Sequence, residues 1–221
     1  TSYFLGEMVI GGAWSFFPMA ILSKTPTALI ALFCFSLLWW PAKRRVGFRD
    51  IRSVVVLMVL FLSALLFAGS NLGLRYALPL YPLALIVSAG FLQVIIRENR
   101  HRWLALLIPL MMFLEGYAAY PHLLAFYNQL VGGPQNGHHL FLDSNLDWGQ
   151  DLKGLEAWIE DEKIEHVYLS YFGTADPRSY SFSFTPMIGS PFFLEKEFQT
   201  FSGPGYIAIS ATNLFGEKQN E

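Results

Sequence analysis

The chain has 221 residues, of which 53% are hydrophobic and 14% are charged, whereas about 25% of an average soluble domain is charged. Residues 1–120 hold ten Lys/Arg and four Asp/Glu, a net charge of +6, and residues 121–221 hold five and thirteen, a net charge of −8. This composition predicts a basic membrane half and an acidic soluble half, and the acidic half argues against nucleic acid as a partner.

The start of the chain indicates that it is part of a longer protein. The chain begins with Thr1 rather than methionine, and no cleavable signal pattern follows. We therefore expect it to be the C-terminal part of a longer protein. Its single cysteine, Cys34, lies in an apolar run, so an intrachain disulfide is excluded.

The first apolar segment, residues 3–23, is interrupted by several glycines and by a proline. Its aromatic residues suit the headgroup level of a membrane, where such rings are enriched: Trp14, Phe16 and Phe17. The pattern predicts a helix that lies at the membrane interface. The alternative is one long span over residues 16–40 that contains Lys24.

Four further apolar runs are each near the length that a helix needs to cross a bilayer. Thr25 and Pro26 are typical of a helix start, since threonine caps free N–H groups and proline tolerates the first helical position. We expect an α-helical polytopic membrane region over residues 1–120, with spans at about residues 26–40, 51–69, 79–96 and 103–120.

Two basic clusters predict how these spans are oriented. Residues 43–52 and 97–102 hold eight of the ten basic residues of this half, and short cytoplasmic loops collect Lys and Arg. With both clusters inside, Lys24, Arg75 and the whole of residues 121–221 lie outside.

The two outer cations have two interpretations. Lys24 and Arg75 either anchor helix ends among lipid headgroups or hold an anionic group at the outer surface, where arginine offers a fork of donors to phosphate. Glu115, near the outer end of the last span, is a candidate to neutralise one of them.

Residues 121–221 predict a small extracytoplasmic α/β domain. Segment 122–131 is amphipathic and is expected to lie along the membrane. Strand, helix and strand follow in that order, which suggests a parallel pair with a right-handed crossover. No element is predicted within 175–202, and the tail 217–221 is expected to be disordered. The predicted strands cover residues 139–143, 166–172 and 206–211, and the predicted helix covers residues 149–163.

A polar loop joins the first predicted strand to the helix. In open α/β units, ligands bind most often at the carboxyl ends of the strands, and this loop is predicted to lie there. Five of its residues are therefore candidates for contact with a substrate or acceptor: Asp143, Asn145, Asp147, Trp148 and Gln150. Helix capping is the simpler explanation for Asp147, with Gln150 bonding back as in a capping box.

The same loop shares part of its spacing with a calcium-binding EF-hand. Asp143, Asn145 and Asp147 occupy its first, third and fifth positions. However, Trp148 stands where the turn glycine belongs, and Gly154 stands where the bidentate glutamate belongs. We therefore expect neither a metal nor another cofactor.

Four motifs occur in order along the chain. They are FPMAILSKTP at residues 17–26, GLRYALPLYP at 73–82, YPHLLAFYNQLVGGP at 120–134 and DSNLDWGQD at 143–151. Together, over about residues 5–172, they resemble the C-terminal half of bacterial phospholipid carrier-dependent glycosyltransferases, which belong to the protein-mannosyltransferase-like GT-C superfamily.

The resemblance implies an integral enzyme of the bacterial inner membrane. It would transfer a sugar from a polyprenyl-phosphate donor to an acceptor at the outer face, with inversion at the anomeric carbon. The resemblance implies Lys24, Arg75 and Tyr76 as ligands of the donor phosphate. It places the catalytic base in an external loop upstream of Thr1, so no catalytic residue is expected in this chain.

Two other functions are compatible with the sequence. The first is a non-enzymatic membrane protein whose extracytoplasmic domain binds a partner or cell-wall material. The second is a transporter fragment, for which broken spans and polar groups at the membrane midplane would be typical. The predicted spans are unbroken and their polar residues gather at the outer ends, which argues against a transporter. An acidic residue in an external loop of the full-length protein would favour the glycosyltransferase over the non-enzymatic protein.

Overall fold

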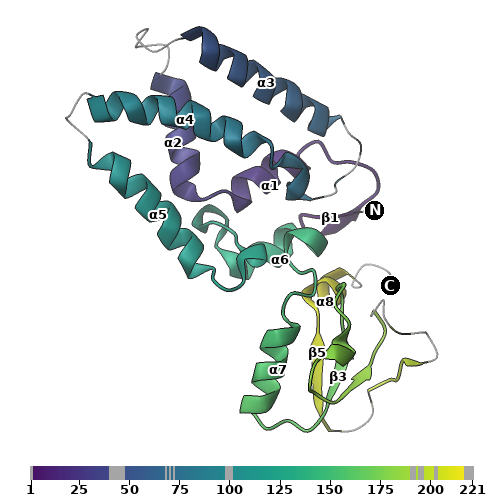
Figure 1. Ribbon diagram of the computed structural model, residues 1–221. Helices are drawn as coiled ribbons and strands as arrows, with labels where there is room; N and C mark the ends of the chain where they lie inside the picture. Colours follow the sequence, from purple (N-terminus) through teal and green to yellow (C-terminus); the bar gives the residue numbers. More distant parts are fainter. Residues whose placement is uncertain are drawn as a thin grey trace. The chain divides into compact units, whose positions relative to one another are not determined.

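The computed structural model of the chain describes residues 2–39, 48–67, 69, 71, 73–97, 102–189, 193, 197–201 and 204–216. The fold is mostly helical with small sheets (Figure 1) and divides into two compact units. The first contains Thr1–Ser2 and Val9–Gly137, and the second contains Tyr3–Met8 and His138–Glu221. The basic residues 43–45, most of cluster 97–102 and the tail 217–221 lie outside the described residues.

Five α-helices form most of the described part of the first unit, and the four predicted apolar runs are confirmed as helices within a few residues of the predicted bounds. α2 packs against α4 and α5, and α3 packs against α4. Apolar side chains point outward from several of these helices, as with Leu38 and Leu106, and large exposed apolar surfaces are typical of membrane contact. The helices are α1 (Phe16–Lys24), α2 (Thr27–Trp39), α3 (Phe48–Leu66), α4 (Leu80–Arg97) and α5 (Leu104–Ala118).

Among the described helices, α4 is long enough and apolar enough to cross a membrane by itself. α1 and the first twelve residues of α2 meet the same criterion only as a pair, and they are bent by 113° at the break between them. The apolar part of α3, Ile51–Leu66, and α5 are shorter. The arrangement with four spans therefore remains a prediction.

Cysteine labelling of intact cells will test the predicted orientation. In a Cys34→Ser background, a cysteine at Asn136 should react with a membrane-impermeant thiol reagent. A cysteine at Gly47, which lies outside the described residues, should react only after the cells are opened. These outcomes follow from the preference of Lys and Arg for cytoplasmic loops. The reverse labelling pattern would place Arg75 on the inner side and contradict its proposed role.

The N-terminal segment differs from the predicted helix over residues 3–23. Strands β1 (Ser2–Phe4) and β2 (Glu7–Val9) form a hairpin, and the helix begins only at Phe16. Leu5 and Gly6 have positive φ angles of 54° and 87°, as in a type I′ hairpin turn. Of the aromatic residues predicted at the headgroup level, Trp14 is 74% exposed, whereas Phe16 is 1% exposed and packs inside the first unit.

The corner between α1 and α2 also differs from the predicted helix start. Thr25 does not cap α2: its hydroxyl donates to the carbonyl of Ile21 at 2.5 Å, which closes the end of α1. The free N–H of Thr27 at the start of α2 donates instead to the Glu115 carboxylate of α5 at 2.7 Å. A carboxylate is favoured at a helix N-terminus by the exposed N–H groups and the helix dipole.

The second unit contains a parallel sheet with strand order β4-β3-β5. The central strand β3 (Val167–Ser170) pairs with β4 (Phe184–Pro186) and with β5 (Tyr206–Ile209), both in parallel. Helix α7 (Leu152–Asp161) packs its apolar side chains against this sheet, and α8 (Ala211–Gly216) follows β5. The buried core consists of Leu152, Ile159, Val167, Leu169, Tyr171 and Phe182.

Three of the elements predicted for this unit are present, and one is not. The predicted helix and the strands at 166–172 and 206–211 are present with shorter bounds. Residues 139–143 form no strand, because Gly137–Leu140 is the short helix α6 and Asp143–Asn145 is the 3-10 turn η6. A short apolar run is compatible with either state, so its periodicity could not decide between them. β4 lies within 175–202, where no element was predicted.

Candidate functional site

Arg75 lies on η2 (Leu74–Ala77), a 3-10 turn that leads into α4. Ala77 is buried and η2 packs against α1 and α3, so the turn is anchored on the helices. Gly73, just before the turn, has a φ angle of 100°, a conformation that favours glycine. The guanidinium of Arg75 is exposed and lies 5.3 Å from the ring centre of Tyr76, which is itself 43% exposed.

Lys24, the other predicted phosphate ligand, is engaged differently. Its ammonium donates to the backbone carbonyls of Leu124 at 2.7 Å and Phe126 at 3.2 Å. The nitrogen also lies 4.2 Å from the ring centre of Tyr127. This position over the ring face is the geometry of a cation–π contact.

These contacts give Lys24 a structural role. It fastens the segment 122–131 to the end of α1, and η2 with Arg75 packs against the same helix. The structure therefore brings the elements that carry Lys24 and Arg75 together, but it directs the ammonium of Lys24 toward the segment 122–131. Of the predicted phosphate ligands, Arg75 and Tyr76 are the exposed ones.

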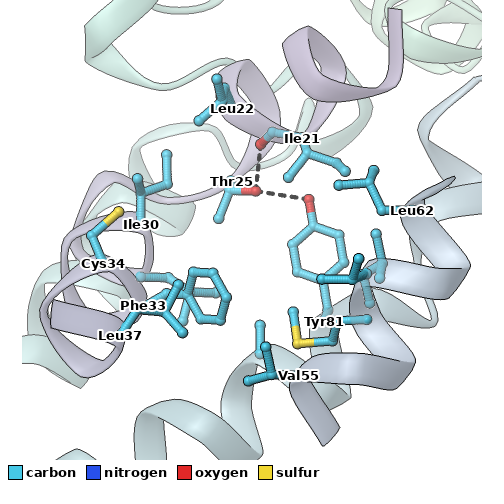
Figure 2. Close-up of a pocket in the computed structure, with 15 residues that line it drawn as sticks. Ile21, Leu22, Thr25, Ile30, Phe33, Cys34, Leu37, Val55, Leu62 and Tyr81 are labelled. Atoms are coloured by element: carbon cyan, nitrogen blue, oxygen red, sulfur yellow. Dashed lines mark hydrogen bonds between the residues drawn. The ribbon is translucent and has the colours of Figure 1, made fainter. Parts of the chain in front are cut away.

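An apolar groove lies among α1, α2, α3 and α4, with a volume of about 390 Å³ (Figure 2). On α2 it extends from Leu29 to Leu37, which corresponds to about 12 Å at 1.5 Å per helical residue. Its lining consists of Ile21, Leu22, Thr25, Leu29, Ile30, Phe33, Cys34, Leu37, Val55, Met58, Val59, Leu62, Leu80, Tyr81 and Ala84.

Two hydroxyl groups belong to this lining, and they are bonded to each other. The oxygen atoms of Thr25 and Tyr81 are 2.8 Å apart. Because the only proton of the Thr25 hydroxyl is donated to Ile21, Tyr81 is the donor in this pair. Figure 2 shows the Tyr81 hydroxyl directed at Thr25. Because the two hydroxyls bond to each other, neither needs a partner from within the groove.

The segment 122–131, which is predicted to lie along the membrane, packs onto the α1–α2 corner. It forms the 3-10 turns η3 (Leu123–Ala125) and η4 (Gln129–Val131). Between them, Tyr127 and Asn128 are each 1% exposed. The side chain of Asn128 donates to the carbonyls of Leu22 and Thr25. Sequence reasoning assigned no role to Asn128 or Tyr81, although both lie in motifs that carry the family resemblance.

The polar loop 143–151 in the second unit is largely structural. Asp147 is buried and does not cap α7, whose N-cap is Asp151. Its carboxylate accepts from the N–H of Gly149 at 2.9 Å and from that of Thr212, at the start of α8, at 3.4 Å. The capping prediction was therefore wrong about the helix. The loop lies at the carboxyl end of β5, because Thr212 closely follows that strand.

The remaining loop residues divide by exposure. Asn145 is buried, Trp148 is half-buried, and Asp143 and Gln150 are exposed. The side-chain oxygen of Gln150 accepts from the N–H of Trp148 at 2.8 Å. The bond runs back toward the N-terminus as in a capping box, but it joins residues two positions apart rather than three. Within the described part of the chain, no three His, Cys, Asp or Glu side chains are placed to hold a metal ion.

The carboxyl end of the sheet is filled by the protein's own side chains. Asn213 donates to the hydroxyl of Ser170 at 3.0 Å and to the carbonyl of Gly189 at 3.2 Å. This end of a parallel sheet is where ligands often bind, but here the side chains of Ser170 and Asn213 are bonded to the protein itself. The first unit therefore provides the better candidate site, formed by the apolar groove together with Arg75 and Tyr76. No family model, curated protein or solved structure matched the chain in the three comparisons with known proteins.

Proposed function

We propose that this chain is the donor-binding part of an integral membrane glycosyltransferase that uses a polyprenyl-phosphate-linked sugar. The reaction would transfer the sugar to an acceptor at the outer face of the membrane. The observation that carries the proposal is the combination of an apolar groove with an exposed arginine on η2, the turn before α4. An amphiphile with a long hydrocarbon tail and an anionic head matches both features.

The groove suits the hydrocarbon tail for physical reasons. Its volume of about 390 Å³ is within the usual range for a ligand site. Burying apolar surface there gains about 25 cal/mol per Å² relative to water. The two hydroxyls of its lining are paired with each other, so an isoprenoid chain in the groove would leave neither hydroxyl unpaired.

Arg75 suits the phosphate. It lies six residues before Tyr81, whose side chain lines the groove, and guanidinium groups form paired, charge-assisted bonds to phosphate oxygens. In the proposed reaction the acceptor attacks the anomeric carbon and the bond from that carbon to the phosphate oxygen breaks. Negative charge grows on the leaving phosphate, which a fixed cation stabilises. The acceptor's proton passes to a general base.

Alkylation of the single cysteine provides a direct binding test. Cys34 lines the groove, so a bound tail should slow its reaction with N-ethylmaleimide in detergent-purified protein. Polyprenyl phosphate should protect at a concentration about tenfold lower than polyprenol, because bonds to a charged group contribute about 1.5–3 kcal/mol. Arg75→Gln should remove this difference while leaving protection by polyprenol intact.

The matched control is Arg102→Gln, which removes another exposed arginine, just before α5. It should leave the preference for the phosphate unchanged. Equal protection by polyprenol and polyprenyl phosphate in the wild-type protein would contradict the proposal. That result would favour a non-enzymatic membrane protein whose second unit binds a partner.

A further inference from the structure

Asn128 holds the α1–α2 corner through its side-chain amide and its backbone N–H. Its side-chain amide donates to the carbonyls of Leu22 at 2.5 Å and of Thr25 at 2.8 Å. Its backbone N–H donates to the carbonyl of Ser23 at 2.8 Å, and its side-chain oxygen accepts from the N–H of Leu130 at 3.1 Å. The last carbonyls of a helix lack partners within the helix, and Asn128 supplies donors to those of α1.

The corner that Asn128 holds also contributes to the apolar groove, because Leu22 and Thr25 both line it. The axes of α1 and α2 are bent by 113° at this corner. The position of the Thr25 backbone determines where its hydroxyl lies. That hydroxyl is in turn the acceptor for the proton of Tyr81.

We propose that Asn128 is a positioning residue for binding of the lipid donor, and that it acts through Thr25 on the hydroxyl of Tyr81. With Asn128 in place, Thr25 keeps the Tyr81 hydroxyl paired and the groove apolar. Without it, the carbonyls of the corner lose their donors and the corner relaxes. The Tyr81 hydroxyl then faces the hydrocarbon tail without a partner, which is unfavourable. This inference rests on the proposed function, because its ligand is the polyprenyl-phosphate tail.

Lys24 fastens the same segment by a separate set of bonds. It donates to the carbonyls of Leu124 and Phe126, whereas Asn128 donates to carbonyls of the corner itself. Loss of Lys24 would therefore loosen the segment, whereas loss of Asn128 would change the carbonyls adjoining the groove. The two residues stabilise the same contact, and only Asn128 is placed to position Thr25.

A double-mutant cycle distinguishes positioning from general stabilisation. Protection of Cys34 by polyprenyl phosphate is measured on the full chain in detergent for wild type, Asn128→Ala, Tyr81→Phe and the double variant. Asn128→Ala should weaken binding about tenfold, as expected when a hydroxyl is left unpaired. In the Tyr81→Phe background the same change should weaken binding by less than about threefold, because residues that act through one another are not additive.

The matched control is Asn136→Ala. Asn136 lies in the same connecting region and donates to the carbonyl of Val131, but it is exposed. Its removal should leave affinity unchanged. If Asn128→Ala does not yield monodisperse protein, Asn128→Ser replaces it, since serine retains the bond to the Leu130 N–H and one donor. The expected pattern is the same, with a smaller loss of affinity.

Two outcomes would overturn the inference. If Asn128→Ala weakens binding equally in the wild-type and Tyr81→Phe backgrounds, the two changes are additive and Asn128 does not act through Tyr81. Unchanged affinity in Asn128→Ala would show that it does not act on the groove. Failure of the proposed function has a different signature, because the wild-type protein itself would then show no preference for polyprenyl phosphate over polyprenol.

Discussion

Replacing Arg75 with alanine should lower sugar transfer by the full-length protein about 100-fold, the loss typical for removal of one preorganised group that stabilises developing charge. Arg75→Lys should lower transfer about tenfold, because lysine keeps the charge but lacks the planar fork that binds two phosphate oxygens. Folding should be unaffected, since the Arg75 side chain is exposed on η2.

The measurement is transfer from a polyprenyl-phosphate sugar in detergent, with size-exclusion chromatography to confirm monodisperse protein. Arg102→Ala controls for the loss of an exposed positive charge and should retain wild-type transfer. Transfer by Arg75→Ala at the wild-type rate would make Arg75 an interfacial anchor and remove the main support for the donor site.

Gly149→Ala should destabilise the second unit by about 3 kcal/mol, from the combined costs of a positive φ angle and of overpacking. Gly149 has a φ angle of 75°, and an added Cβ would lie 2.7 Å from the Cα of Gly173 and closer still to the hydroxyl oxygen of Tyr171. The Tyr171 side chain has no room to withdraw, because it is buried and its hydroxyl donates to the Gly149 carbonyl.

Gly154→Ala is the matched control in the same unit. Gly154 is exposed in α7, and an added Cβ would meet no atom within 4 Å. Alanine is favoured over glycine inside a helix by about 1 kcal/mol, so this variant should be slightly stabilised. Hydrogen exchange of the β3 amides in the full chain measures both changes. Exchange in Gly149→Ala at the wild-type rate would contradict the close packing of Gly149 against Gly173.

The elements that the sequence predicted well are those with long, uniform patterns. The apolar runs became α2 to α5 because helices of this composition need no particular partner to satisfy their backbone. α7 was predicted because Leu152, Leu155 and Ile159 recur at helical spacing. The errors lie in short segments. Residues 139–143 and Phe184–Pro186 are too short for periodicity to distinguish a strand from other states, and β4 owes its conformation to pairing with β3.

The candidate site likewise has features that the sequence predicted and features that it could not predict. By itself, the sequence determined that Arg75 lies at the end of an apolar helix, because a cation beside a long apolar run is visible in the residues alone. Only the tertiary structure decided which hydrogen bonds the polar groups form. It directs Lys24 to the carbonyls of Leu124 and Phe126 and pairs Tyr81 with Thr25, 56 positions apart in the chain. Such bonds depend on distances between segments remote in sequence, which no local pattern records.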